Sequence, residues 1–225
     1  MSQDIKKQGK ISSSTEDLRQ IQATRGTEIH QLITSAIIAA LYVVLTLPFA
    51  QISFGIIQIR FSELLCVLPV VTPGAIWGLF LGCFLANLLN PFNLGPIDIV
   101  LGSLATLSAA WLTYHLSRRF YRGSYDESAL TFMKDSWNSK QKAWRRLLLD
   151  IAILSPSCIF NALIVGTYLP FLITDAKRSL GAVLVSQLSI LASQTLVVIV
   201  LGLPFLRLLS RLHVPKLLPQ AKDLS

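Results

Sequence analysis

Charged side chains are scarce in this sequence. Of its 225 residues only 14% are charged, while 52% are hydrophobic. A soluble domain usually carries about 25% charged residues. So few charges cannot cover a surface that faces water, and the composition therefore indicates a protein that is largely surrounded by lipid. The length suits a single domain.

Residues and motifs for catalysis or metal binding are also missing. The three cysteines, Cys66, Cys83 and Cys158, lie in apolar runs without a CxxC pair, so we interpret them as small packing residues. The three histidines match no metal-ligand spacing. No phosphate-binding loop, HExxH or GxSxG motif is found. We predict no enzyme, no metal and no cofactor, so uphill transport by this chain would need a partner that supplies energy.

What the sequence does contain is a series of apolar runs near the roughly 20 residues that a membrane-spanning helix needs. They predict an all-α membrane protein with a bundle of six transmembrane helices. The expected spans are 29–50, 52–71, 74–90, 96–116, 147–173 and 180–206. We expect a polar tail over 1–28, a transmembrane domain over 29–208 with a basic loop at about 117–146, and a second tail over 209–225.

The positive charges are distributed unevenly between the two sides of the predicted bundle. The first tail, the 117–146 loop and the residues after the last span, 207–225, contain five, eight and four Lys and Arg residues, seventeen together, against two in the loop after the fifth span. Basic residues favour the cytoplasmic side. This bias predicts cytoplasmic termini in the cell membrane and an even number of spans. It also explains the net charge of +8 without nucleic-acid binding.

The basic loop allows two interpretations. Leu130, Met133, Trp137 and Trp144 fall at helical spacing with basic residues between them, a pattern typical of an amphipathic helix in the membrane interface. Alternatively, the end of the loop simply extends the fifth span.

Arg60 and Glu63 are the most unusual residues of the predicted spans. They lie three residues apart, on one helical face of an otherwise apolar run. Each charge costs about 2.5–3.5 kcal/mol at a helix centre, so such residues usually face a cavity or a partner. Either they form a binding site, or they form an ion pair that holds helices together.

Other polar residues in the spans are further candidates. Asp98 opens the fourth span, where it either caps a helix or binds a ligand. Asn87, Asn161 and Gln194 are amides that serve as ligand contacts or as interhelical hydrogen bonds. Small residues recur every fourth position in the third span, at Gly74, Gly78, Gly82 and Ala86, and in the first span at Ala36 and Ala40. They permit close helix packing, inside the bundle or against another protein.

Several segments of the spans form a recognisable set. They are Ala39–Thr46, Ile52–Gly55, Gln58–Glu63, Val67–Pro69, Gly78–Cys83 with Asn87, Asp98–Thr106, Asn161–Gly166 and Leu201–Pro204. Together they resemble the QueT family, the substrate-binding S components of energy-coupling factor (ECF) transporters for queuosine precursors. The resemblance covers about 36–118 and 155–208.

The resemblance implies a six-helix S-component fold, no catalytic activity and a bound small molecule, here a deazaguanine-type base. It also implies an energising module of two ATPases and a transmembrane coupling protein, on which Ala36 and Ala40 would dock. The sequence departs from the family in the last span, where Ser193-Gln194 stands in place of Gly-Glu. This difference bears on the choice of substrate.

A planar base needs a few polar contacts between apolar or aromatic walls. We expect Arg60, Glu63, Asn87, Asp98, Asn161 and Gln194 to supply the contacts. Trp77 and Phe54 are the candidate stacking partners. Two other hypotheses remain, an S component for another vitamin and a membrane structural or assembly protein.

Overall fold

The computed structural model describes residues 26–50, 60–91, 94–121, 140–173 and 180–211. All regular structure in these ranges is helical. The first helix is Gly26–Phe49, and its last turn tightens into a 3-10 turn, η1 (Leu47–Phe49), at Pro48. The described part of this helix includes residues 26–28, which precede the span predicted from 29. Residues 1–25 and 212–225, which make up most of the predicted tails over 1–28 and 209–225, and stacking candidate Phe54 lie outside the described residues.

The next three elements are η2 (Phe61–Val70), α3 (Gly74–Leu89) and α4 (Pro96–Tyr121). Two long helices follow, each made of three consecutive pieces. The first consists of α6 (Lys140–Phe160), η4 (Asn161–Val165) and α7 (Gly166–Ile173). The second consists of α8 (Leu180–Gln194), η5 (Thr195–Leu201) and α9 (Gly202–Arg211). The elements η4 and η5 are π-helical segments inside these helices.

Four of the described helices are long and apolar enough to cross a membrane: Gly26–Phe49, Pro96–Phe120, Leu147–Leu172 and Leu180–Leu209. The second and third predicted spans are represented by shorter apolar helices, Phe61–Val70 and Gly74–Leu89. The element η2 is a 3-10 helix with Pro69 inside it, and its ten residues rise about 20 Å. Residues 52–59 of the second predicted span lie outside the described residues. The structure thus confirms an all-α membrane protein. The described residues contain four full-length spans and two shorter apolar helices, and the count of six spans stays a prediction.

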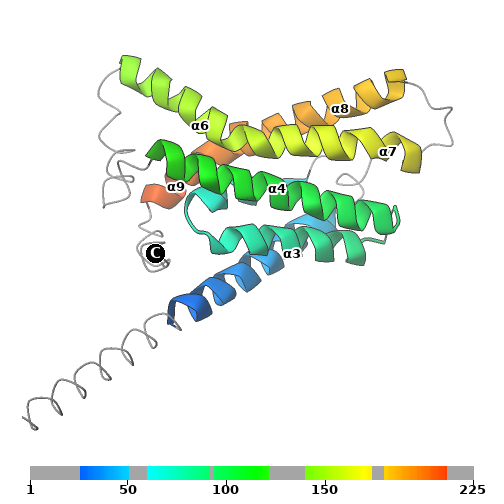
Figure 1. Ribbon diagram of the computed structural model, residues 1–225, viewed down its shortest axis with the longest axis horizontal. Coiled ribbons are helices and arrows are strands. Elements are labelled where there is room, and N and C mark those ends of the chain that lie inside the picture. Colours follow the sequence, from blue (N-terminus) through cyan, green and yellow to red (C-terminus); the bar gives the residue numbers. More distant parts are fainter. Residues whose placement is uncertain (1–25, 51–59, 92–93, 122–139, 174–179, 212–225) are drawn as a thin grey trace, which may run out of the picture.

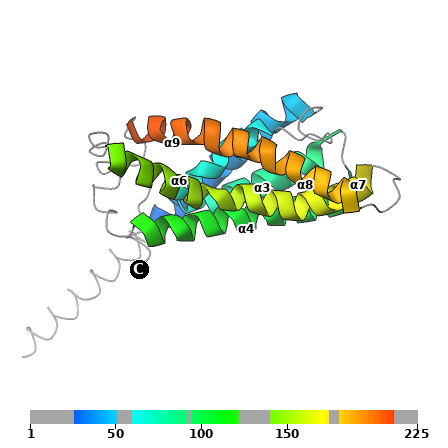
Figure 2. The ribbon, with the colours of Figure 1, turned by 90° about the horizontal axis from the view of Figure 1, so that it is seen from above.

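Helices α3, α4 and α6–α7 lie side by side (Figures 1 and 2). Helix α8 packs against the helix formed by α6, η4 and α7, and α9 packs against η2. The start of the fifth span extends back to Lys140 in α6. For residues 140–146 this supports the second interpretation of the basic loop, in which its end continues the span. The proposed interfacial helix over Leu130, Met133 and Trp137 lies outside the described residues.

The small residues of α3 pack against the first helix. A Cβ added at Gly82 would lie 2.6 Å from Tyr42 Cβ, and one added at Gly78 would lie 2.8 Å from Ile38 Cβ. Ser35 Oγ donates a hydrogen bond of 2.7 Å to the Gly74 carbonyl oxygen. Glycine is therefore required along this contact, because any side chain would separate the two helices.

Apolar side chains face outward and polar ones face inward in much of the bundle. Leu32, Leu180 and Leu188 are 72%, 85% and 65% exposed, whereas Glu63 and Asp98 are each 1% exposed. Such an arrangement is unfavourable in water and favourable in lipid. Apolar packing around Tyr42, Leu79 and Leu154 forms the main core, next to the buried polar residues.

Candidate functional site

Glu63 is the centre of a buried hydrogen-bonded cluster. It lies in the first turn of η2, close to Tyr42 of the first helix and Asn161 of η4. Tyr42 Oη donates to Glu63 Oε1 at 3.1 Å. Cys66 Sγ and Asn161 Nδ2 approach Glu63 Oε2 at 2.9 and 3.5 Å. All three groups therefore serve as hydrogen-bond donors to the two carboxyl oxygens of Glu63.

Asp98 is the centre of a second buried group, at the start of α4. Tyr168 Oη, from α7, donates to Asp98 Oδ1 at 2.8 Å. Asn87 Nδ2, from α3, donates to the Asp98 carbonyl oxygen at 3.3 Å. The Asp98 carboxyl group thus contacts a second helix, in addition to lying in the first turn of its own. Its roles as a helix cap and as a ligand contact stay predictions.

Arg60 is a buried cation near both groups. It precedes η2, is only 4% exposed, and lies within electrostatic range of Asp98 and Glu63 as well as Tyr42. The sequence predicts Arg60 and Glu63 either as part of a binding site or as a mutual ion pair. The structure adds Asp98, which lies 35 positions after Glu63 in the sequence, to the charged groups near Arg60. We call Arg60, Glu63, Asp98, Asn87 and Asn161 with Tyr42 and Tyr168 the polar cluster.

Two buried amide oxygens near this region accept no hydrogen bond within the described part of the chain. They are Oδ1 of Asn87 and Oε1 of Gln194, whose residues are 1% and 4% exposed. An unsatisfied buried acceptor costs about 1–3 kcal/mol, so each such atom requires an explanation. In a ligand-binding site, a hydrogen-bond donor on the bound molecule would satisfy these oxygens.

Both late helices change to π-helix at the candidate amides. Asn161 is the first residue of η4, and Gln194 is the residue directly before η5. A π segment widens the helix locally and often marks a functional position. Helix α8 packs against η4, which brings the two amide-bearing regions of the bundle together.

The structure therefore brings five of the six predicted site residues into one polar cluster and buries the sixth, Gln194, at the end of the neighbouring α8. The predicted stacking residue Trp77 is 60% exposed and its ring packs edge-on against Phe80 at 6.2 Å. It points away from the cluster because the glycine face of α3, not the Trp77 face, meets the bundle. This part of the prediction is wrong for the conformation described.

Sequence reasoning missed the tyrosines and gave the cysteines too small a role. Tyr42 and Tyr168 lie in apolar spans, where a hydroxyl usually finds a partner when it is buried. This need of a buried tyrosine hydroxyl for a partner was the sequence signal that could have identified both residues. Cys66 contacts Glu63, and Thr106 Oγ1 lies 3.4 Å from Cys83 Sγ, so both thiols belong to the polar interior rather than only filling space.

No group of three or more His, Cys, Asp or Glu side chains that could hold a metal ion is found in the described residues. Between positions 31 and 117 the sequence contains only three charged residues, Arg60, Glu63 and Asp98. The cluster thus offers two carboxyl groups, one guanidinium, two tyrosine hydroxyls and the unsatisfied amide oxygen of Asn87. These groups can bind the hydrogen-bond donors of a small polar molecule. Among the described residues of the cluster there is no activated nucleophile of a recognised kind.

The fold and its inverted distribution of polar and apolar side chains define a multi-pass α-helical membrane protein. Residues 32–211 match the model of the family described as QueT transporter, and the chain belongs to this family. A transporter family agrees with the expectation that the chain is not an enzyme.

A curated relative supports the assignment. The queuosine precursor transporter QueT of Lactococcus lactis subsp. cremoris (strain MG1363) is 34% identical over 96 residues, which are 42% of this chain and 55% of the relative. The chain thus spans about half the length of the relative it matches. No solved structure matches the chain significantly.

Proposed function

We propose that this protein is the substrate-binding S component of an ECF-type importer and that a deazaguanine-type base binds at the polar cluster. The family match and the name of the Lactococcus relative support the transport of a queuosine precursor. The observation that carries the site is the burial of two carboxylates beside amide oxygens without a hydrogen-bond donor.

The chemistry of the base suits this cluster. A guanine-like edge presents neighbouring N–H donors, which carboxylate and amide oxygens accept, and a carbonyl, which an amide or a guanidinium can bind. Glu63 already binds three protein donors, so ligand N–H groups would replace the weakest of them, the 3.5 Å contact with Asn161. Asn87 Oδ1 would gain its missing donor.

The energy for transport would come from a partner, because the chain has no phosphate-binding loop. We assign this role to an energising module of two ATPases and a transmembrane coupling protein. Ala36 and Ala40 are exposed on the first helix, beside Leu32, Ile37 and Val44, which are 72%, 55% and 63% exposed. Small residues on an exposed apolar helix face let a second helix approach closely.

The positive-inside bias supports placing both termini in the cytoplasm, with the chain in the cell membrane. In this orientation the basic ends of α4, α6 and α9 face the cytoplasm. The opposite ends of the helices, where Asp98 begins α4, face outward.

Thermal unfolding of the detergent-purified protein tests the proposal. Deazaguanine bases and a set of vitamins are added separately. A ligand at a hundred times its dissociation constant stabilises the folded state by about 2.7 kcal/mol, so a deazaguanine should raise the unfolding temperature by several degrees. Stabilisation by a vitamin alone would instead support an S component for that vitamin. If no compound has an effect, the structural or assembly protein becomes the better hypothesis.

A further inference from the structure

An exposed apolar stripe runs along α4, on the outside of the bundle. Ile97, Val100, Leu104 and Trp111 are 52%, 49%, 44% and 54% exposed. Their spacing of three, four and seven residues keeps them on one side of an α-helix. At about 1.5 Å per residue the stripe is roughly 21 Å long, somewhat longer than the hydrocarbon part of one lipid leaflet.

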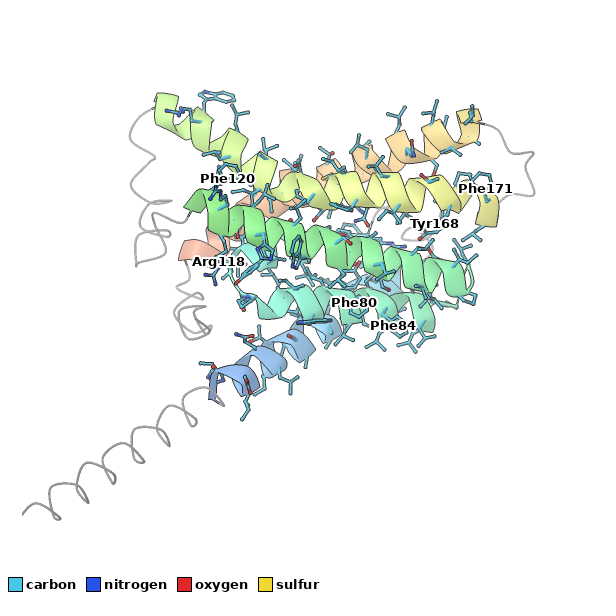
Figure 3. All side chains as sticks on the ribbon, viewed as in Figure 1. Phe80, Phe84, Arg118, Phe120, Tyr168 and Phe171 are labelled. Carbon is cyan, nitrogen blue, oxygen red and sulfur yellow. The ribbon has the colours of Figure 1, made fainter. Side chains whose placement is uncertain are left out.

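The stripe ends in an aromatic and basic patch, Trp111–Arg119. His115 and Arg119 continue the same face at successive four-residue steps and are exposed. The rings of Trp111 and His115 lie 4.2 Å apart, and those of Tyr114 and His115 lie 5.4 Å apart. The Arg118 guanidinium lies 5.0 Å from the centre of the Tyr114 ring. Figure 3 shows Arg118 at this end of α4.

Other helices add positive charge at the same end of the bundle. The start of α6, with exposed Trp144 and Arg145, and the end of α9, with exposed Arg207, lie at the end where α4 finishes (Figures 1 and 2). The sequence has no Asp or Glu in 99–121 or 202–211, whereas α6 contains one acidic residue, Asp150, which is 8% exposed. In the described residues the basic side chains at this end of the bundle therefore outnumber the acidic ones.

We propose that the α4 stripe and the Trp111–Arg119 patch bind an anionic phospholipid. An acyl chain lies along Ile97, Val100 and Leu104, while the phosphate meets His115, Arg118 and Arg119. Indole rings prefer the headgroup level of a bilayer, and guanidinium groups bind phosphate oxygens well. A soluble phosphate or a nucleic acid would contact only the cations, whereas a phospholipid would contact both the cations and the apolar stripe next to them.

Fluorescence quenching of single-tryptophan variants tests this lipid site on the full chain. The chain has four tryptophans, so three are replaced by phenylalanine and only Trp111 is kept. The variant is placed in nanodiscs of mixed phosphatidylglycerol and phosphatidylcholine, and either lipid alone is brominated on its acyl chains. Brominated phosphatidylglycerol should quench Trp111 more strongly than brominated phosphatidylcholine.

Trp77 is the matched internal reference. It is 60% exposed on α3, whose sixteen residues include no Lys or Arg. A variant that keeps only Trp77 should be quenched equally by the two lipids. Equal quenching of Trp111, or the same preference at Trp77, would show that the patch has no selectivity for anionic lipid and would overturn the proposal.

Charge substitutions separate a local site from the general field of the basic end. Arg119→Gln in the Trp111-only protein should lower the preference for phosphatidylglycerol roughly fivefold. Arg207→Gln removes the same charge from the same end but from α9, and it should leave the preference at Trp111 nearly unchanged. An equal effect of both substitutions would refute a local site. So would loss of the quenching preference when soluble glycerol phosphate is added, because the cations would then suffice without the stripe.

Discussion

Replacing Glu63 by glutamine removes one charge at the centre of the polar cluster while keeping the size of the side chain. The carboxylate accepts from Tyr42, Cys66 and Asn161, and its two oxygens share these three donors. Glutamine offers one acceptor oxygen and a donor amide. At least one of the three protein donors, or a ligand N–H, then loses its acceptor.

The expected size of the effect follows from the burial of Glu63, which is 1% exposed. A buried donor without an acceptor costs about 1–3 kcal/mol, and each 1.36 kcal/mol is a factor of ten in an equilibrium constant. If a base binds at Glu63, Glu63→Gln should raise its dissociation constant by about fivefold to a hundredfold. Isothermal titration calorimetry of the purified variant measures this constant directly.

The same variant distinguishes a binding role from a structural one. If Glu63 only holds helices together, the whole cost appears in the unfolding temperature of the ligand-free protein and the dissociation constant stays as in the wild type. The control is Ser155→Ala, which removes a hydroxyl that donates to the Ala152 carbonyl on an exposed part of α6. A Glu63→Gln protein with wild-type affinity would refute the assignment of Glu63 to the ligand site.

Three further predictions concern docking, packing and topology. Ala40→Trp should block co-purification with the energising module and leave ligand affinity unchanged, whereas Leu188→Trp, at an exposed position of α8, should assemble normally. Normal assembly of the Ala40→Trp protein would exclude docking on this face of the first helix. Gly82→Ala should lower the unfolding free energy by about 1–3 kcal/mol, because the added Cβ would lie 2.6 Å from Tyr42 Cβ. Gly26→Ala is the control, since a Cβ there would meet no atom within 4 Å, and equal unfolding curves for the two variants would contradict the close packing. A cysteine introduced at Ser2 should resist impermeant labelling reagents added to intact cells, and efficient labelling would place the N-terminus outside.

The sequence alone determined the class of protein and the supply of site residues. Runs of about 20 apolar residues and so few charges leave no other environment than lipid, and a charge inside such a run costs enough to mark Arg60 and Glu63 as candidates. The small residues of the third span also predicted a close helix contact, which Gly78 and Gly82 make with the first helix. These properties depend on composition and local spacing, which any conformation of the chain retains.

Only the tertiary structure decided which polar groups meet. Asp98 bonds to Tyr168 across 70 residues, and Glu63 contacts Asn161 across 98, and no local pattern encodes contacts of that range. The rotation of each helix is set by how its small and large side chains pack against neighbours. That rotation placed Trp77 on the outer surface, although its span was correctly predicted. The 3-10 winding of η2 and the π segments at Asn161 and Gln194 likewise arise where packing overrides the regular α-helix. The sequence therefore predicted the spans, while the packed bundle set their length and decided which side of each helix faces inward.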